Sequence, residues 1–336
     1  MPARVPWIIA FLLCVGIVLF VLHLCIGPVA IPVDEVWSAL FGHGSSTTIR
    51  IIHSVRLPEA ITATLAGGGL AACGLLMQTL FRNPLAGPSV LGLSSGASLG
   101  VALLMLAVPS GAAVLPAFGV GLGAIVGAMA VLGVIMLADR RMGDGVALLI
   151  IGLMIGYLCS AVISVLQVAS SAGALRGYIL WGMGSFTGVV PGRMGWLMVP
   201  VVMGLLGAFW LVKPLNALLL GEAYAASVGV DVRPTRSRIM WITGLLAGTI
   251  TAFCGPIAFL GLATPHVARG LCRTSDHAVL MPVTILTGAV LALFCDLLIK
   301  LPGVGVGIPL NAVTSLLGAP VVAWVLLRGK RWARAT

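Results

Sequence analysis

The chain has 336 residues, of which 60% are hydrophobic and 8% charged, and its mean hydropathy is +1.16. A soluble globular domain carries charge on about a quarter of its residues, so the composition excludes that class. The net charge of +10 is no nucleic-acid signal, because aromatic side chains do not interleave with the basic ones. We therefore expect an all-α polytopic membrane protein, with residues 1–336 as one transmembrane domain in the lipid bilayer.

The membrane spans are predicted from apolar runs bounded by Gly, Pro or charged residues. A span needs about 20 mostly apolar residues. The first run is interpreted as an uncleaved span, since it is longer than a signal-peptide core and no clear cleavage site follows it. The ten candidate spans are 6–27, 57–81, 89–108, 112–137, 146–168, 193–212, 238–254, 256–270, 278–299 and 307–327, and the limits near 254–277 are the least defined.

The basic residues set the orientation. A cytoplasmic N-terminus leaves 14 of the 19 Lys and Arg residues inside and five outside, which is a positive-inside bias. An even number of spans returns the C-terminus to the cytoplasm. Two outer segments are then long enough to fold, residues 28–56, with a short amphipathic helix at VDEVWSALFG, and residues 169–192. The second is either a half-helix beside the pathway or an interfacial helix anchored by Tyr178 and Trp181.

Glycine is frequent inside the spans. Gly119, Gly123 and Gly127 recur every four residues, and the second span contains AGGGLAACG. Small residues let helices approach closely in lipid, so tight bundling is the favoured interpretation and a functional hinge the alternative. The seven cysteines fall mainly in apolar runs without a CxxC pair, which indicates buried free thiols rather than disulfides or a metal site.

The cytoplasmic loop from Lys213 to Arg238 is polar in an otherwise apolar chain. It contains two of the nine acidic and four of the 19 basic residues. Small residues alternate with larger ones from Leu218 to Val228, and Gly229 then ends the predicted helix. A short helix with small side chains is a shape that a second protein can grip, so we expect this loop to receive force from a partner.

Sites for chemistry are scarce in this sequence. The glycine run has phosphate-loop spacing, but Leu75 stands where the lysine must be, so the chain is not expected to hydrolyse ATP. His266 is interpreted as a structural hydrogen-bonding residue, and Asp296 and Lys300 as a local i,i+4 ion pair. His23, Glu59 and Asp296 are the ionisable residues nearest a span interior. No catalytic pair is found, which leaves an intramembrane enzyme poorly supported.

Four stretches together resemble the FecCD-type permeases of bacterial ABC importers for iron-siderophore, haem and cobalamin. They are RLPEAITATLAGGGLAACGLLMQTLFRNPLAGPSVLGLSSGASLG, GEAYAASVGV, CGPIAFLGLATPHVARGLCRTSDHAVLMPVTILTGAVLALFCDLL and GAPVVAWVLL. They occur in the family's order and cover nearly the whole chain.

The resemblance implies a type II importer in the bacterial inner membrane. It would be a homodimer of ten-helix subunits (a heterodimer with a related permease is the alternative), with two cytoplasmic ATPases and a periplasmic binding protein. ATP and Mg would be used by the ATPases, and no cofactor would be bound by this chain. The implied coupling residues are Gly221, Glu222, Ala225, Ala226, Ser227 and Gly229. Arg56 and Lys300 match positions where the family places cations that dock the binding protein.

Two departures from the family pattern concern that docking face. Glu59 stands where the family usually repeats arginine after RLP. The run GVGVGIPLN lacks the usual acidic residue, and Asn311 is its nearest polar group. We therefore expect an altered interface with the binding protein.

The substrate path is expected along the fifth span and the segment after it. Methionine and aromatic residues give adaptable apolar surface for a bulky chelate, with sparse hydrogen bonds from Ser and Gln. The candidates, for which helix packing is the alternative role, are Met154, Tyr157, Ser160, Ser164, Gln167, Trp181 and Met183. A cytoplasmic gate is expected at Gly143, Asp144 and Gly145, where a plain turn is the alternative.

The expected function is import of an iron chelate, haem or cobalamin by alternating access, with the substrate among these left open. The alternative is a secondary carrier driven by an ion gradient. Such carriers usually need buried charges or unwound polar helices near the midplane, and both are scarce here.

Overall fold

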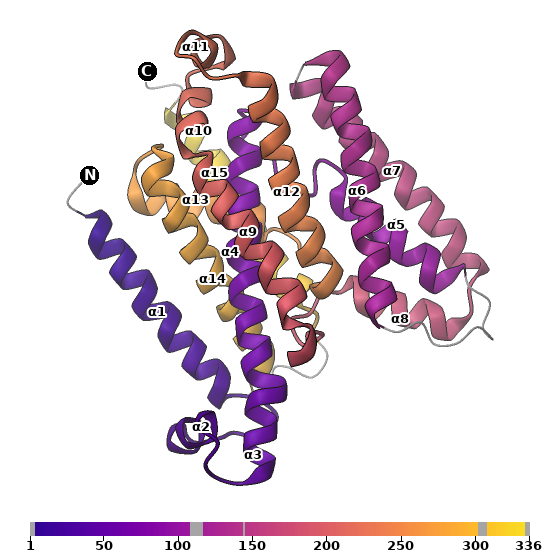
Figure 1. The fold of residues 1–336 in the computed structure, drawn as a ribbon, viewed down its shortest axis with the longest axis vertical. Helices are drawn as coiled ribbons and strands as arrows, with labels where there is room; N and C mark the ends of the chain where they lie inside the picture. The colour runs from indigo at the N-terminus through magenta and orange to yellow at the C-terminus, as the bar shows by residue number, and fades with distance from the viewer. Residues whose placement is uncertain (1–3, 108–116, 144, 302–307, 333–336) are drawn as a thin grey trace.

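The computed structural model describes residues 4–107, 117–143, 145–301 and 308–332, and all the regular structure in them is helical. Figure 1 shows long helices running roughly side by side, with the short helix α11 (Glu222–Ser227) at one end of the molecule. The short helices α2 (Val33–Leu40) and α3 (Ser46–Ile51) lie at the opposite end. These two ends are called the α11 end and the α2 end below.

Each of the ten predicted spans coincides with a helix. The largest differences are in α6, which begins and ends five residues later than predicted, in α15, which ends five residues later, and in α12, which begins six residues earlier. The ten helices are α1 (Val5–Cys25), α4 (Leu57–Leu80), α5 (Leu93–Leu106), α6 (Ala117–Met142), α7 (Gly145–Ala169), α9 (Met194–Trp210), α12 (Val232–Cys254), α13 (Leu260–Cys272), α14 (His277–Lys300) and α15 (Leu310–Trp332).

Seven helices of the described chain are long and apolar enough to cross a membrane. One of them is continuous from Ser46 to Leu80, because a π-helical turn (Ile52–Arg56) joins α3 to α4. The helices α5 and α13 are shorter, with 14 and 13 residues. The bilayer core is about 30 Å thick and a helix rises 1.5 Å per residue. These two helices are therefore too short to cross the bilayer core by themselves.

The helix α4 is the centre of the bundle, packed against α9, α12, α13 and α14. Its glycines make this packing possible. A Cβ atom on Gly67 would overlap the carbonyl oxygen of Gly288 in α14, and one on Gly74 would overlap that of Gly261 in α13. The tight bundling predicted from the glycine-rich second span is therefore confirmed.

A second glycine contact joins α5 to α6. A Cβ on Gly127 would overlap the carbonyl oxygen of Gly96, and one on Gly100 would overlap that of Gly123. Around this seam lies a second hydrophobic core, separate from the main one. Its buried members come from α5, α6, α7, α8 (Ala172–Gly182) and α12: Ala97, Val101, Ala102, Leu106, Ala124, Ala128, Ile163, Tyr178 and Ala252.

The two predicted outer segments both contain a short helix. In α2, Val36 and Ala39 are buried while Trp37 is exposed, so the predicted amphipathic helix is confirmed. In α8, the hydroxyl of the buried Tyr178 donates to the carbonyl of Ser98 in α5, at 3.4 Å. The seven cysteines are free, as predicted, but Cys14 is exposed on α1 rather than buried.

Candidate functional site

The polar loop from Lys213 to Arg238 folds into α10 (Val212–Leu219), α11 and the first turns of α12. Gly221 precedes α11 with a φ of +112°, and Gly229 follows it with a φ of +87°. Residues other than glycine rarely adopt these backbone angles, so the glycines fix where α11 begins and ends. The predicted short helix with a glycine end is thus confirmed as a structure, and its force-receiving role stays a prediction.

The six expected coupling residues differ in burial, with some on the inner face of the loop and others on its outer face. Gly221 and Ala225 are buried, and Glu222 is partly exposed. Ala226, Ser227 and Gly229 are exposed. The helix α11 therefore exposes Ala226 and Ser227 together with Tyr224, and its buried side is held through Ala225.

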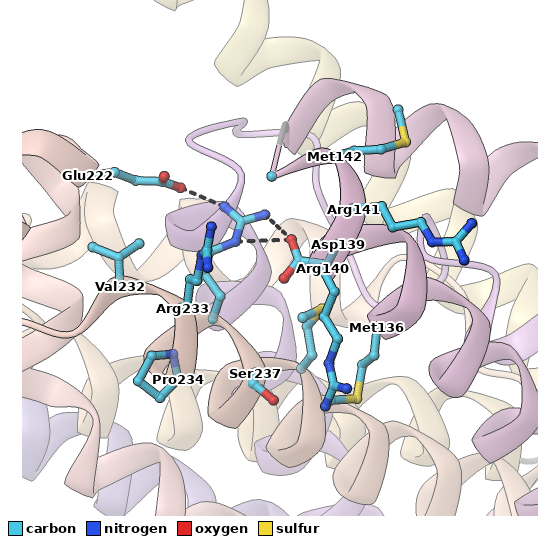
Figure 2. Close-up of a pocket in the computed structure, with 13 residues that line it drawn as sticks. Met136, Asp139, Arg140, Arg141, Met142, Glu222, Val232, Arg233, Pro234 and Ser237 are labelled. Carbon is cyan, nitrogen blue, oxygen red and sulfur yellow. Dashed lines mark hydrogen bonds and ion pairs between the residues drawn. The ribbon is translucent and has the colours of Figure 1, made fainter.

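A buried arginine connects this helix to the transmembrane bundle. Arg236 of α12 donates from Nη1 to Glu222 Oε1 at 2.6 Å, and from Nη2 and Nε to Asp139 Oδ1 of α6 at 2.6 and 3.1 Å. Figure 2 shows Glu222 and Asp139 on opposite sides of this guanidinium. The Arg236 side chain is 5% exposed, that of Asp139 12% and that of Glu222 42%. We call these three residues the Arg236 clasp.

The clasp lines a cavity of about 480 Å³ between the last turns of α6 and the start of α12. Arg140, Arg141 and Arg233 also line it, which makes its wall basic. Gly143, one of the expected gate residues, lies at its edge with a φ of +61°. Gly145 begins α7, and Asp144 lies outside the described residues. The gate therefore stays a prediction.

A second polar network anchors α10 on the other side of α11. Asn216 donates from Nδ2 to Asp276 Oδ1 at 2.7 Å, and its Oδ1 accepts the backbone N–H of His277 at 2.8 Å. His277 Nε2 lies 2.8 Å from the hydroxyl of Thr79 in α4. Asp276 is the N-cap of α14, and the bonds from the Ala278 N–H and from Asn216 hold the pKa of this carboxyl below its ordinary value. Through these contacts α10 is fixed to α14 and α4.

The expected path residues fall into two places. Met154, Tyr157, Ser160 and Ser164 lie on the exposed face of α7. Gln167 is half-buried near the end of the same helix. Trp181 instead lines a separate apolar groove of about 420 Å³ with residues of α6, α9 and α12. The predicted path residues therefore do not line one common cavity within a single chain.

Met183 belongs to a cluster of hydrogen bonds centred on Asn311, at the start of α15. The Asn311 amide donates to the carbonyls of Gly182 at 3.1 Å and Pro256 at 2.7 Å, and its Oδ1 accepts the N–H of Ala258 at 2.9 Å. Its backbone N–H donates to the carbonyl of Met183 at 3.2 Å. Asn311, the polar residue nearest to the missing acidic one, thus joins three segments of the fold.

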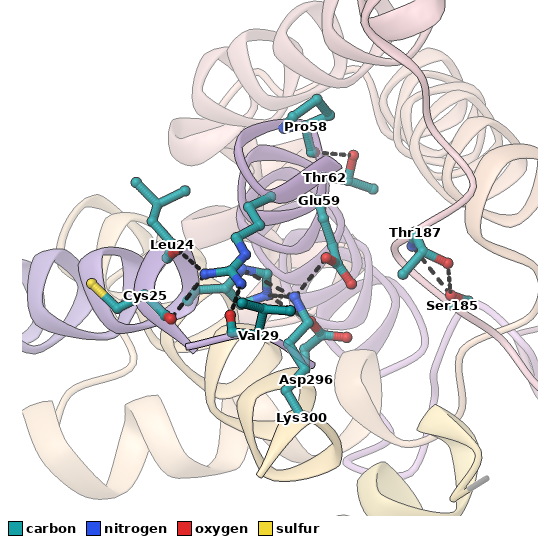
Figure 3. A network of polar contacts seen from close by, with 12 residues as sticks. Leu24, Cys25, Val29, Pro58, Glu59, Thr62, Ser185, Thr187, Asp296 and Lys300 are labelled. Atoms are coloured by element: carbon teal, nitrogen blue, oxygen red, sulfur yellow. Dashed lines mark hydrogen bonds and ion pairs between the residues drawn. The ribbon is translucent and has the colours of Figure 1, made fainter. Parts of the chain in front are cut away.

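The two expected docking cations are both engaged inside the chain. Lys300 Nζ lies 2.6 Å from Glu59 Oε2 and 3.3 Å from Asp296 Oδ2, so the predicted i,i+4 pair of Asp296 and Lys300 is confirmed. His23 Nε2 lies 2.6 Å from the same Asp296 oxygen and 3.0 Å from Lys300 Nζ. Figure 3 shows Glu59, Asp296 and Lys300 converging on one point at the α2 end.

Arg56 is 4% exposed and points toward the end of α1. It donates to the carbonyls of Leu24, Cys25 and Val29, where a cation is favourable at a helix C-terminus. Internal acceptors already hold both cations, and their docking role stays a prediction.

The model of the FecCD transport family matches residues 13–328 of this sequence. The chain belongs to the FecCD transport family. The vitamin B12 import system permease protein BtuC of Shigella boydii is 36% identical over 326 residues, which cover 96% of each chain. BtuC of Klebsiella pneumoniae is 37% identical over 314 residues, covering 94% of this chain and 91% of the relative.

Solved structures agree with this assignment to the FecCD family. A structure described as an inward-facing conformation of a metal-chelate type ABC transporter superposes with a TM-score of 0.85 at 29% identity, covering 96% of this chain and 99% of that one. PsaBC from Streptococcus pneumoniae, at a TM-score of 0.55 and 16% identity, shares the fold alone. The chain is thus the multi-pass permease of a FecCD-type ABC importer and works within an ABC transporter complex, as a subunit distinct from the ATPase.

The sequence does not predict the pairing of Arg236 with Asp139. Arg236 was counted only as one of the inside cations, because the predicted span began after it, at residue 238. Asp139 lies 97 positions away from it in the sequence. The available signal was an acidic residue directly before Arg140 and Arg141 at the end of an apolar run. It identifies no partner by itself.

Proposed function

We propose that this permease carries a bulky metal chelate, with cobalamin the first candidate, from the periplasm to the cytoplasm. The observation that carries the proposal is the similarity to BtuC, which extends over 96% of both chains at 36% identity. Haem and iron-siderophore complexes are the alternative cargoes, because the family includes their permeases. The α11 end would face the cytoplasm, as the positive-inside bias indicates, and the α2 end the periplasm.

The proposed assembly contains two copies of this chain, two cytoplasmic ATPases and a periplasmic binding protein. The exposed face of α7 supports the contact between the copies. It carries Tyr157, Ser160 and Ser164 among large apolar residues. Ser164 Oγ donates to the Ser160 carbonyl within α7 at 2.9 Å, but the Tyr157 hydroxyl would have poor hydrogen-bond partners in lipid, whereas a second α7 and a passing chelate offer them. The same face would then line a path along the dimer axis.

The proposed energy source is ATP hydrolysis by the partner subunits, received at α11. Its exposed small residues leave room for a groove of the ATPase to close around the helix, with Ala226 and Ser227 outermost. Movement of α11 would switch the path between its two openings, with the turn at Gly143 as the inner gate.

The test is uptake into proteoliposomes that contain this chain, its ATPase and the binding protein. Cobalamin, haem and a ferric siderophore are supplied separately, with and without ATP inside. We expect ATP-dependent accumulation of one of them, and loss of uptake in Ala226→Trp but not in Ala172→Trp, an exposed position in α8. Uptake that needs no nucleotide and stops when a protonophore is added would instead establish an ion-driven carrier.

A further inference from the structure

We infer that Arg236 is the residue through which a displacement of α11 reaches α6 and α12. It acts as a positioning residue for transport coupling, and this inference rests on the proposed function. The clasp joins three elements that are distant in sequence, with Glu222 from α11, Arg236 from α12 and Asp139 from α6.

The geometry of the clasp is specific to arginine. Three different nitrogens of the one guanidinium donate, one to Glu222 and two to Asp139. A planar fork can hold two carboxylates on different edges at once, whereas a lysine ammonium offers a single point of charge. The Arg236 and Asp139 side chains are 5% and 12% exposed, so water competes weakly for the bonds between them, whereas the Glu222 side chain is 42% exposed. The two carboxylates are therefore held in a fixed relation to each other.

The helix α11 is otherwise attached in a way that permits it to pivot. The left-handed glycines Gly221 and Gly229 lie on either side of it, and Ala225 is its one fully buried side chain. On the preceding side, Asn216 fixes α10 to α14 and α4 through Asp276, His277 and Thr79. Because α10 is fixed, a force on α11 displaces α11 relative to α10. Glu222 then transmits this displacement to Arg236.

On the receiving side, the clasp acts on helices that are already bound together. Asp139 lies in the last turn of α6, three residues before its end at Met142. The glycine seam joins α6 to α5, and α6 also packs along α12. Displacement of Asp139 therefore moves α6 together with α5, and with them the turn that leads into α7.

The relay can be cut at two places without removing the buried cation. Glu222→Met removes the acceptor on α11 but leaves Arg236 paired with Asp139, and Asp139→Leu removes the acceptor on α6 but leaves Arg236 paired with Glu222. Each change is nearly isosteric. Asp231→Asn is the matched control, because Asp231 is an exposed carboxylate of the same loop and caps no backbone N–H of α12 with its side chain.

The experiment measures substrate transported per ATP hydrolysed in proteoliposomes, together with co-purification of the ATPase and thermal unfolding of each variant. We expect each single variant to retain the ATPase and to transport about five- to tenfold less substrate per ATP, the lower range of coupling between linked sites. The double variant should transport as much substrate per ATP as either single variant, because both changes interrupt the same connection. Arg236→Lys should match them.

Three results would overturn the inference. They are single variants that transport as much per ATP as wild type and Asp231→Asn, defects that multiply in the double variant, and losses that follow the unfolding temperature alone. These differ from failure of the proposed function, in which the wild-type chain itself shows no ATP-dependent uptake.

Discussion

Glu59 and Lys300 form a buried ion pair between α4 and α14, with 2.6 Å between Oε2 and Nζ. Glu59 departs from the arginine expected after RLP, and in this chain it pairs with Lys300 inside the bundle. The pair also shares Asp296 and, through it, His23 of α1. The α2 ends of three transmembrane helices are therefore held by one cluster of charges.

Removing one partner of this pair should destabilise the protein strongly. Lys300→Met leaves Glu59 and Asp296 buried with less compensation, at a cost of about 3–5 kcal/mol. The double variant Glu59→Gln, Lys300→Met should recover part of that loss. Tryptophan fluorescence during thermal unfolding in detergent measures both, with the exposed Arg50→Met as control. Equal unfolding temperatures for Lys300→Met and Arg50→Met would contradict the assignment.

Burial of Lys300 also bears on how a binding protein docks. A cation that pairs internally contributes little to attraction across a wet interface, so Lys300→Met should leave the salt dependence of binding-protein association unchanged. The measurement is the dissociation constant at several ionic strengths, on variants that remain folded. A flattened salt dependence would show that Nζ leaves Glu59 and meets the partner, restoring the docking role expected from the sequence.

Two glycines of α6 should respond in opposite ways to alanine. Gly127→Ala places a methyl group against the backbone of Gly96, so we expect a loss of about 1–3 kcal/mol from overpacking. Nothing lies within 4 Å of a Cβ at Gly133, where alanine should be neutral or stabilise by about 0.4–1 kcal/mol. Thermal unfolding of the two variants side by side tests this. Similar shifts would mean that the seam can relax.

Asn311 offers a test in which size hardly changes. Asn311→Asp keeps the acceptor for the Ala258 N–H but turns a carboxylate oxygen toward the carbonyls of Gly182 and Pro256. We expect destabilisation by about 1–3 kcal/mol, measured as a lower unfolding temperature, because two acceptors lose their donor. A neutral result would show that water or a protonated carboxyl replaces the amide.

Acid should weaken the N-cap of α14. The folded-state pKa of Asp276 is depressed, so its contribution is present above the unfolded pKa of about 3.9 and is lost as pH falls through the folded value. Asp276→Ala should cost about 1 kcal/mol near neutral pH, and its difference from wild type should shrink in strong acid. Unfolding temperatures measured from pH 7 down to pH 3 test this. A difference that grows toward low pH would contradict it.

The helices were predictable because their signal is local. Apolar runs bounded by Gly, Pro and charge located all ten, and the glycine spacing predicted the close seams. The start of α12 was predicted six residues too late because the stretch VRPTRS is polar, which is typical of a loop. In the structure this stretch forms the first turns of α12, and its Arg233, Arg236 and Ser237 line the cavity.

The pairing of charges was not predictable, because partners lie far apart in the sequence. The sequence places Lys300 on the outer side and pairs it with Asp296 one turn away, but it does not reveal Glu59, 241 positions earlier (300 − 59 = 241), whose Oε2 lies 2.6 Å from Lys300 Nζ. Asp139 and Arg236 escaped for the same reason. The path residues were chosen by residue type, which does not show whether they lie together. In the structure Trp181 lines a groove with α6, α9 and α12 instead of the exposed face of α7.

A helix of 13 residues rises only about 20 Å, roughly 10 Å less than the apolar thickness of a bilayer. The helix α13 therefore leaves the irregular stretch before it, from Gly255 to Phe259, inside the membrane's depth. Lipid offers the peptide groups there no hydrogen-bond partner, and Asn311 supplies one donor and one acceptor to them. One amide side chain thus stands in for water at the point where the polypeptide stops being helical.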